Sequence, residues 1–346
     1  MTGNKGVSMT GKRCVASFAF CTLTRWALAA SAISLAGCLG LNAASLSPRK
    51  GAELRRDPQP ERCTPRWSGA ALVWVEDNDT AHPELLAMDA AGRALPTIRF
   101  GIPGAYFVAV NSIARGADGT TALTGHSIAD DGRIAHFLAW VAPDGTASQV
   151  IRTDPFLPRQ VCLTSDGTLW TEGQRAQGSD LDSGPTGGII RHFDRTGRLI
   201  GSFVPASSLE DEVQAAMGFL AAAGNRVGWI SSGHRRPGTT VPGSYLEIDG
   251  DGTTRQYPLP ASTQEPSIYG FAMTQDGFVF AEVATGDDSH GKLVLMSLDR
   301  EHRIWAPAIA PDVPQGTNSF LLGASGNTVA LWDKQSRIVH LLDAAK

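Results

Sequence analysis

The chain has 346 residues, 42% of them hydrophobic, and a formal net charge of −4. Binding of nucleic-acid phosphates depends on a concentrated basic face, so this charge balance argues against a nucleic-acid partner. The length is enough for one large domain together with an N-terminal leader.

The first 37 residues have the features of an export signal. They contain four cations and no acid, and an apolar run from Trp26 to Ala36 ends in small residues. This run is too short to span a bilayer, so residues 1–37 are predicted to be a cleaved signal peptide rather than an uncleaved membrane helix. Translation from Met9 would give a signal of more ordinary length. Cleavage leaves 26 cations against 34 acids, a net charge of −8.

The stretch Leu35-Ala36-Gly37-Cys38 resembles the lipobox of bacterial lipoproteins. The resemblance implies cleavage before Cys38, which then carries the lipid anchor, and stable anchoring requires more than one acyl chain. Leu39 is not the aspartate that favours inner-membrane retention in this class. We therefore expect the protein in the cell envelope, anchored to the outer membrane and facing the periplasm or the cell surface.

Residues 38–61 are predicted to be a flexible tether, because they are rich in Arg and Pro and lack apolar periodicity. Residues 62–346 are assigned to the folded domain. After processing, this domain contains two cysteines, Cys63 and Cys162. An oxidising compartment permits a disulfide between them, and two buried free thiols are the other possibility.

Six short turns recur along the domain at intervals of 48 to 58 residues, a period that is typical of propellers and stacked arrays. Each is flanked by short apolar runs, such as 71–75 and 278–281, and contains residues that tolerate a positive φ, so each is predicted to join two strands of a hairpin. In chain order the turns are Ser68-Gly69, Asp118-Gly119, Asp166-Gly167, Gly224-Asn225, Asp276-Gly277 and Gly326-Asn327.

A second turn follows most of these by roughly 25 residues, which makes each unit two hairpins, or one four-stranded propeller blade. These turns are Ala91-Gly92, Asp144-Gly145, Thr196-Gly197, Asp251-Gly252 and Asp299-Arg300. The predicted fold is therefore an all-β six-bladed propeller. The sixth unit ends near Asp343, where its second turn is due. We predict that a segment before Cys63 supplies the missing outer strand and closes the ring.

Large residues recur on the second strand of the predicted blades, and these are Trp74, Leu123, Trp170, Trp229, Phe280 and Trp332. An aromatic row of this kind can form a carbohydrate platform, but blades that pack face to face need one bulky side chain each, which favours a place in the core.

One segment departs from the β pattern. Ser207 followed by Glu210 is a capping box, and a short helix is predicted over 207–220.

The stretch 191–203 (RHFDRTGRLIGSF) resembles the repeat of NHL-type six-bladed propellers. The stretch 163–170 (LTSDGTLW) resembles the complementary half of such a repeat, which also occurs in the SMP-30/gluconolactonase and virginiamycin B lyase groups. The resemblance implies the fold and no single activity, because these propellers serve as lactonases, lyases, sensors and binding platforms. The lactonase branch would bring a divalent cation and the lyase branch a catalytic histidine and a metal, but no motif in this sequence matches those ligands.

Connections in a propeller alternate between two faces, so the tight turns lie on one face and the longer connections on the other, which we call the long-loop face. Loops carry function when a rigid scaffold positions them, so a site is expected at the mouth of the central channel on this face. The candidate binding residues are Glu76, His126, Arg159, Glu172, His234, Tyr269, Glu282 and His290. Further polar candidates beside them are Asp77, Asp79, Arg235, Arg236, Asp287, Asp288 and Asn318.

Two functions fit these features. The first is a lipid-anchored binding or scaffold protein whose long-loop face docks an envelope protein, a peptidoglycan fragment or a saccharide. The second is a lactonase-like metal-dependent hydrolase, or a lyase, in which carboxylates and histidines of this face hold one divalent cation. Polar loop residues are also expected to be simply solvated, and neither a metal-ligand spacing nor a Gly-x-Ser-x-Gly elbow is present.

Overall fold

The structure is a computed structural model that describes residues 44–55, 64–76, 80–146, 148–175, 188–205, 218–236, 239–259, 268–285, 292–308 and 319–345. The chain divides into two compact units, Met1–Asn42 and Ala43–Lys346, and all described residues belong to the second. The described part is all-β and consists of six antiparallel sheets of four strands each. The predicted six-bladed propeller is thereby confirmed.

Each blade has four strands that follow one another from the centre of the ring outward. From the innermost to the outermost strand, blades 1 to 3 consist of β2 (Arg66–Ser68), β3 (Ala71–Glu76), β4 (Glu84–Asp89) and β5 (Ile98–Arg99); β6 (Ala105–Arg115), β7 (Thr121–Ala129), β8 (Ile134–Val141) and β9 (Ser148–Arg152); and β10 (Phe156–Leu163), β11 (Leu169–Arg175), β12 (Gly188–Phe193) and β13 (Leu199–Pro205). In the same order, blades 4 to 6 consist of β14 (Gly218–Ala223), β15 (Arg226–Arg236), β16 (Thr239–Ile248) and β17 (Thr254–Tyr257); β18 (Ile268–Met273), β19 (Val279–Thr285), β20 (Lys292–Asp299) and β21 (Ile304–Pro307); and β22 (Ser319–Ser325), β23 (Thr328–Asp333), β24 (Ile338–Ala345) and β1 (Ser45–Arg55).

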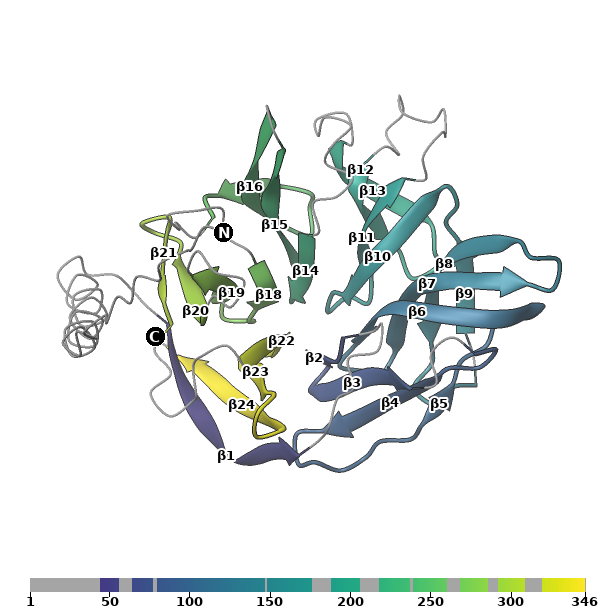
Figure 1. Ribbon diagram of the computed structural model, residues 1–346, viewed down its shortest axis with the longest axis horizontal. Helices are drawn as coiled ribbons and strands as arrows, with labels where there is room; N and C mark the ends of the chain where they lie inside the picture. Colours follow the sequence, from purple (N-terminus) through teal and green to yellow (C-terminus); the bar gives the residue numbers. More distant parts are fainter. Residues whose placement is uncertain are drawn as a thin grey trace, which may run out of the picture. The chain divides into compact units, whose positions relative to one another are not determined.

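The innermost strands of the six blades form a closed ring around the centre of this unit (Figure 1). Each contacts the innermost strands of the two neighbouring blades, in the order β2, β6, β10, β14, β18, β22 and back to β2. Because the strands within a blade are antiparallel, the turn from first to second strand lies on one face and the connection from second to third strand on the opposite, long-loop face.

The turns between first and second strands form as the sequence predicts. Each of the six has its glycine at a positive φ, between 58° and 93°, which residues with a Cβ adopt only with strain. These glycines are Gly69, Gly119, Gly167, Gly224, Gly277 and Gly326. Four of the five turns that join the third and fourth strands of blades 1 to 5 also have a glycine at a positive φ. In the fifth, which lacks glycine, Arg303 takes a φ of 56°.

The ring is closed by the two ends of the domain sequence. Strand β1 pairs antiparallel with β24, in a register that places Ser45 opposite Ala345 and Arg55 opposite Ile338. The predicted outer strand from the segment before Cys63 is thus confirmed, and it leaves blade 6 with four strands. Residues 45–55 lie within the stretch that we expected to be a tether, so this part of the stretch belongs to the propeller instead.

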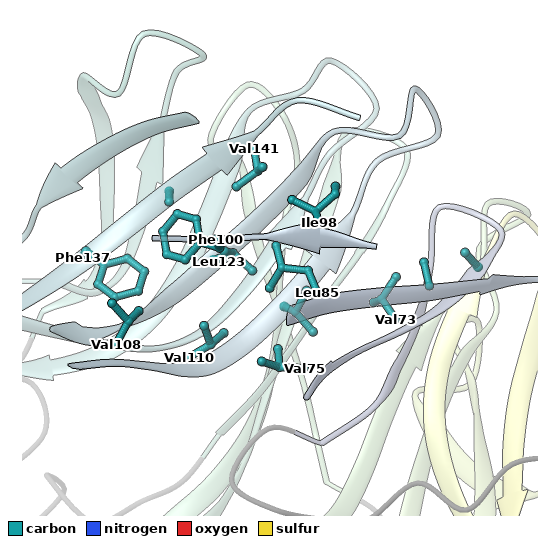
Figure 2. Close-up of a cluster of buried hydrophobic side chains, with 14 residues drawn as sticks. Val73, Val75, Leu85, Ile98, Phe100, Val108, Val110, Leu123, Phe137 and Val141 are labelled. Atoms are coloured by element: carbon teal, nitrogen blue, oxygen red, sulfur yellow. The ribbon is translucent and has the colours of Figure 1, made fainter. Parts of the chain in front are cut away.

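The hydrophobic core is divided into six clusters, and each lies between two neighbouring blades. Figure 2 shows the cluster between blades 1 and 2, where Val73 and Leu85 face Val110 and Phe137. The large second-strand residues from Trp74 to Trp332 are all buried, with exposed fractions of 7% or less. They fill the gaps between blades, as the core interpretation predicts, and form no exposed platform.

Two further expectations concern helices. The helix predicted over 207–220 falls mainly on residues 206–217, which lie outside the described residues, and its last three positions begin strand β14 instead. Among the residues that the structure describes, no helix is long and apolar enough to cross a membrane.

Candidate functional site: the central cavity

A cavity of about 720 Å³ occupies the centre of the ring and is lined by residues from the innermost strand of every blade. The lining is mainly apolar and aromatic, with small residues between the large ones. Its aromatic members are Trp67, Phe219, Tyr269, Phe271, Phe320 and Trp332. A cavity of this size and composition falls within the range that is usual for small-molecule sites in proteins.

Three cations line the cavity, and they are Arg66, Arg159 and Lys334. Arg66 is held in place by its neighbours in blade 3, because its guanidinium donates to the Val161 carbonyl at 3.0 Å and to Gln160 Oε1 at 2.7 Å. Lys334 is exposed and follows the second strand of blade 6, which places it on the long-loop face. Among the described residues that line the cavity there is no aspartate or glutamate.

The predicted candidates Arg159 and Tyr269 both belong to this lining. They lie near the start of β10 and β18, where the first strands of blades 3 and 5 leave the long-loop face. Tyr269 is 49% exposed. The structure thus places an aromatic ring and a guanidinium side chain at the mouth of the cavity.

Glu172 lies behind the cavity wall, opposite the lining residue Gln160 in the β10–β11 ladder. Its side chain is 3% exposed. Burial raises the pKa of this carboxyl to about 7, although the Arg159 charge, the Gly218 N–H and Arg66 act in the opposite direction. Gly218 begins the next blade, so the hydrogen bond from its N–H joins blade 3 to blade 4.

Glu282 occupies the equivalent position in blade 5, opposite Gly270 in the β18–β19 ladder. It is also 3% exposed, and burial raises its pKa to about 8 against the effect of one hydrogen bond. That bond comes from the Leu321 N–H at 3.0 Å, in the first strand of blade 6. Both carboxyls therefore connect successive blades, a role that the sequence shows only as two glutamates at matching strand ends.

Two further candidates with described side chains, Glu76 and His126, do not line the cavity. Glu76 is exposed at the end of β3, where its carboxylate accepts a hydrogen bond from Trp74 Nε1 at 3.1 Å. His126 lies in β7 opposite His136, with its ring 5.9 Å from that of Phe107. No group of three His, Cys, Asp or Glu side chains in the described part could hold a metal ion.

Several predicted polar candidates have no described side chain. Nothing is described of the side chains of His234, Arg235 and Arg236 in β15. Asp77, Asp79, Asp287, Asp288, His290 and Asn318 lie outside the described residues altogether.

Cys162 is a buried free thiol in the cavity wall. Burial raises the pKa of this thiol to about 12, which keeps it protonated and unreactive at neutral pH. Of the two possibilities left open by the sequence, the structure shows the free thiol for Cys162, while Cys63 lies outside the described residues.

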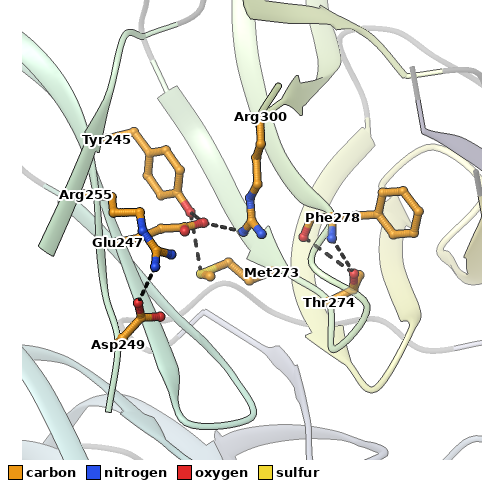
Figure 3. Close-up of polar contacts among 8 residues, drawn as sticks. All are labelled: Tyr245, Glu247, Asp249, Arg255, Met273, Thr274, Phe278 and Arg300. Atoms are coloured by element: carbon orange, nitrogen blue, oxygen red, sulfur yellow. Dashed lines mark hydrogen bonds and ion pairs between the residues drawn. The ribbon is translucent and has the colours of Figure 1, made fainter. Parts of the chain in front are cut away.

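A polar cluster that the sequence did not indicate lies between blades 4 and 5 (Figure 3). The Tyr245 hydroxyl donates to Glu247 Oε1 at 2.6 Å, and Arg300 pairs with the same carboxylate. Burial raises the pKa of Tyr245 well above its ordinary value, so its hydroxyl stays protonated and can donate. None of these three residues lines the central cavity, and the cluster links two blades in the same manner as Glu172 and Glu282.

No protein-family model and no curated protein sequence matches the chain. Among solved structures it is similar to a streptogramin B lyase, with 11% identity, coverage of 88% of this chain and 98% of that chain, and a TM-score of 0.42. It is also similar to a gluconolactonase from Xanthomonas campestris, with 11% identity, coverage of 88% of this chain and 98% of that chain, and a TM-score of 0.39. A glucose dehydrogenase is similar with 12% identity, coverage of 87% of this chain and 99% of that chain, and a TM-score of 0.43. At these identities the similarity concerns the fold alone, so function has to be argued from the site.

Proposed function

We propose that the protein is a binding protein of the cell envelope that takes a small ligand into the central cavity from the long-loop face. The observation that carries this proposal is the cavity itself, about 720 Å³ in volume and lined by all six innermost strands. Apolar walls exclude water and a few polar groups at the mouth give orientation, which is the usual design of a ligand site. The ring of strands around the cavity is a rigid frame, so little ordering is required when a ligand enters.

The proposal retains the lipid anchor at Cys38 and the outer-membrane location expected from the lipobox. The ligand is then a molecule that occurs in the envelope, and a peptidoglycan fragment or a saccharide remains a candidate, as does a segment of an envelope protein. The nucleic-acid exclusion rests on the net charge of the mature chain.

A neutral fluorescent probe tests whether the cavity binds anything. We expect N-phenyl-1-naphthylamine to bind the full chain, with Cys38 replaced by Ser for solubility, in a saturable one-to-one manner. The variant Ala222→Trp, which fills the cavity from β14, should abolish this binding, whereas Ala91→Trp on an exposed outer turn should not. Binding that survives Ala222→Trp in a variant with an unchanged melting temperature would show that the cavity is not the site.

A hydrolase or lyase is the second candidate, and one observation favours it. The pKa values of Glu172 and Glu282, about 7 and 8, lie in the range where a carboxyl can exchange protons at neutral pH. Both carboxyls are engaged with backbone N–H groups of the next blade, which makes this candidate secondary. Turnover of an aromatic lactone by the wild-type chain, lost in Glu172→Gln, would place it first.

A further inference from the structure

We infer that the ligand of the central cavity is an organic anion, with an acidic group held by Arg159 and Lys334 at the mouth and an apolar or aromatic body among the aromatic walls. This inference rests on the proposed function and adds the chemical class of the ligand. It is carried by the distribution of charge in the lining, where three cations meet no aspartate or glutamate among the described residues.

The charge of the cavity contrasts with that of the whole molecule. The chain carries 34 acids against 30 cations, so chance placement would favour acids in any lining. An acidic protein that lines its cavity with cations attracts anions into that cavity locally while its outer surface does not. The attraction is stronger at the half-buried Arg159 than at the exposed Lys334, because charges interact more strongly where water is partly excluded.

The three cations are not equally available. Arg66 is committed to Val161 and Gln160 by its hydrogen bonds, so it contributes charge and holds the wall in place. Arg159 is half-buried, and Lys334 is exposed. A guanidinium binds a carboxylate, sulfonate or phosphate through two parallel N–H donors, and an ammonium adds a second, mobile charge.

One buried acid interacts with two of these cations, since the charges of Arg159 and Arg66 both act to lower the pKa of the Glu172 carboxyl. It lies in the second strand behind the wall, and burial raises its pKa to about 7. At neutral pH a substantial fraction of this carboxyl is therefore protonated. It offsets the cavity cations only in part, which leaves positive charge for a ligand.

The other part of the ligand is defined by the aromatic residues of the lining. Tyr269 is 49% exposed at the mouth, and Phe320 lies in the adjacent first strand of blade 6. Trp332 lies in the second strand of the same blade, directly opposite Phe320 in the ladder. The centroids of the two rings are 5.7 Å apart. Aromatic faces at this position suit a flat apolar body more than a fully hydroxylated one.

Two matched probes test the inference. 8-Anilinonaphthalene-1-sulfonate carries an acidic group on the same ring system as the neutral N-phenyl-1-naphthylamine. We expect the wild-type chain to bind the sulfonate about tenfold or more tightly than the neutral probe, since a charge-assisted contact is of that order. Arg159→Gln and Lys334→Gln should each weaken sulfonate binding several-fold or more and leave binding of the neutral probe within twofold.

The matched control is Arg93→Gln, which makes the same charge change at an 81% exposed side chain on a turn of blade 1, away from the cavity lining. It should change the affinity for neither probe.

Equal affinities of the wild-type chain for the two probes, or equal effects of Arg93→Gln and Arg159→Gln on sulfonate binding, would overturn the anion inference while leaving the cavity site intact. Failure of the neutral probe to depend on Ala222→Trp would instead overturn the proposed function. Lys334→Gln concerns an exposed side chain, so it keeps the test valid if Arg159→Gln lowers the melting temperature.

Discussion

At the scale of single residues, the buried carboxyl of Glu282 should make the stability of the propeller depend on pH. Its pKa is about 8 in the folded chain against an ordinary 4.5, so the folded state holds a proton that the unfolded state has already lost between these values. The contribution is fully present below pH 4.5 and is lost as pH rises toward 8. We expect Glu282→Gln, which keeps the acceptor for Leu321 N–H, to reduce the fall in unfolding free energy between pH 5 and 8 by about 2 to 3 kcal/mol.

Urea denaturation at a series of pH values measures this difference. Glu76→Gln is the matched control. Glu76 is the last residue of the second strand of blade 1, and Glu282 lies near the end of the second strand of blade 5. The two differ in that Glu76 is exposed. The control should keep the pH dependence of the wild-type chain. A Glu282→Gln variant with that same dependence would mean that the carboxyl ionises in the folded state much as it does in the unfolded one.

At the scale of elements, the closing strand β1 should contribute to stability through one deeply buried side chain. Leu46 is 1% exposed and packs with Phe280, Leu295 and Leu342 in the cluster between blades 5 and 6. Replacing a leucine in such a place with alanine removes apolar contacts and leaves a cavity, at a cost of about 2 to 5 kcal/mol. We expect Leu46→Ala to lower the unfolding free energy in urea by that amount.

The neighbouring residue in the same strand gives the comparison. Ser47 is exposed, so Ser47→Ala should change the unfolding free energy by no more than about 0.5 kcal/mol. Similar effects of the two substitutions would show that β1 does not close blade 6 in solution. A large effect of Leu46→Ala alone would establish that residues before Cys63 are part of the domain rather than a tether.

The elements were predictable to the extent that local residues determine them. The tight turns followed from glycines such as Gly119 and Gly277, because a positive φ at a fixed point is a local requirement that only few residue types meet. Closure by β1 followed from counting strands, since the last unit lacked one. The wall of the cavity was not predictable in the same way, because it is assembled from short segments of six strands that lie far apart in the sequence.

Contacts between blades were also hidden from the sequence. Glu172 and Glu282 stand at matching positions, but their partners are backbone N–H groups of Gly218 and Leu321, which no side-chain pattern marks. Glu247 and Arg300 pair through their side chains, but they are 53 residues apart, so the sequence gives no sign of this contact either. Polar residues at strand ends therefore resemble site residues in the sequence, whereas in the fold their contacts with the next blade hold the ring together.

At the scale of the whole molecule, the ring of blades joins both ends of the domain, which brings residue 45 next to residue 345 in blade 6. A chain anchored at Cys38 would therefore enter the propeller only a few residues after the lipid, since β1 begins at Ser45. Such a short connection would hold the domain close to the membrane surface. It would also limit the orientations in which the long-loop face meets a ligand or a partner.

The proposed anchor is tested by the fate of the full chain in the cell. We expect the wild-type protein in the membrane fraction and Cys38→Ser in the soluble fraction, because the loss of the acylated cysteine removes the acyl chains, each of which contributes about 0.8 kcal/mol per buried methylene to membrane binding. Cys63→Ser is the matched control, since it removes a cysteine that lies outside the lipobox, and it should stay with the membrane. Labelling with an alkyne fatty acid should mark the wild-type chain and the control but not Cys38→Ser. A Cys38→Ser protein that remained with the membrane and took up the label would place the attachment elsewhere in the chain.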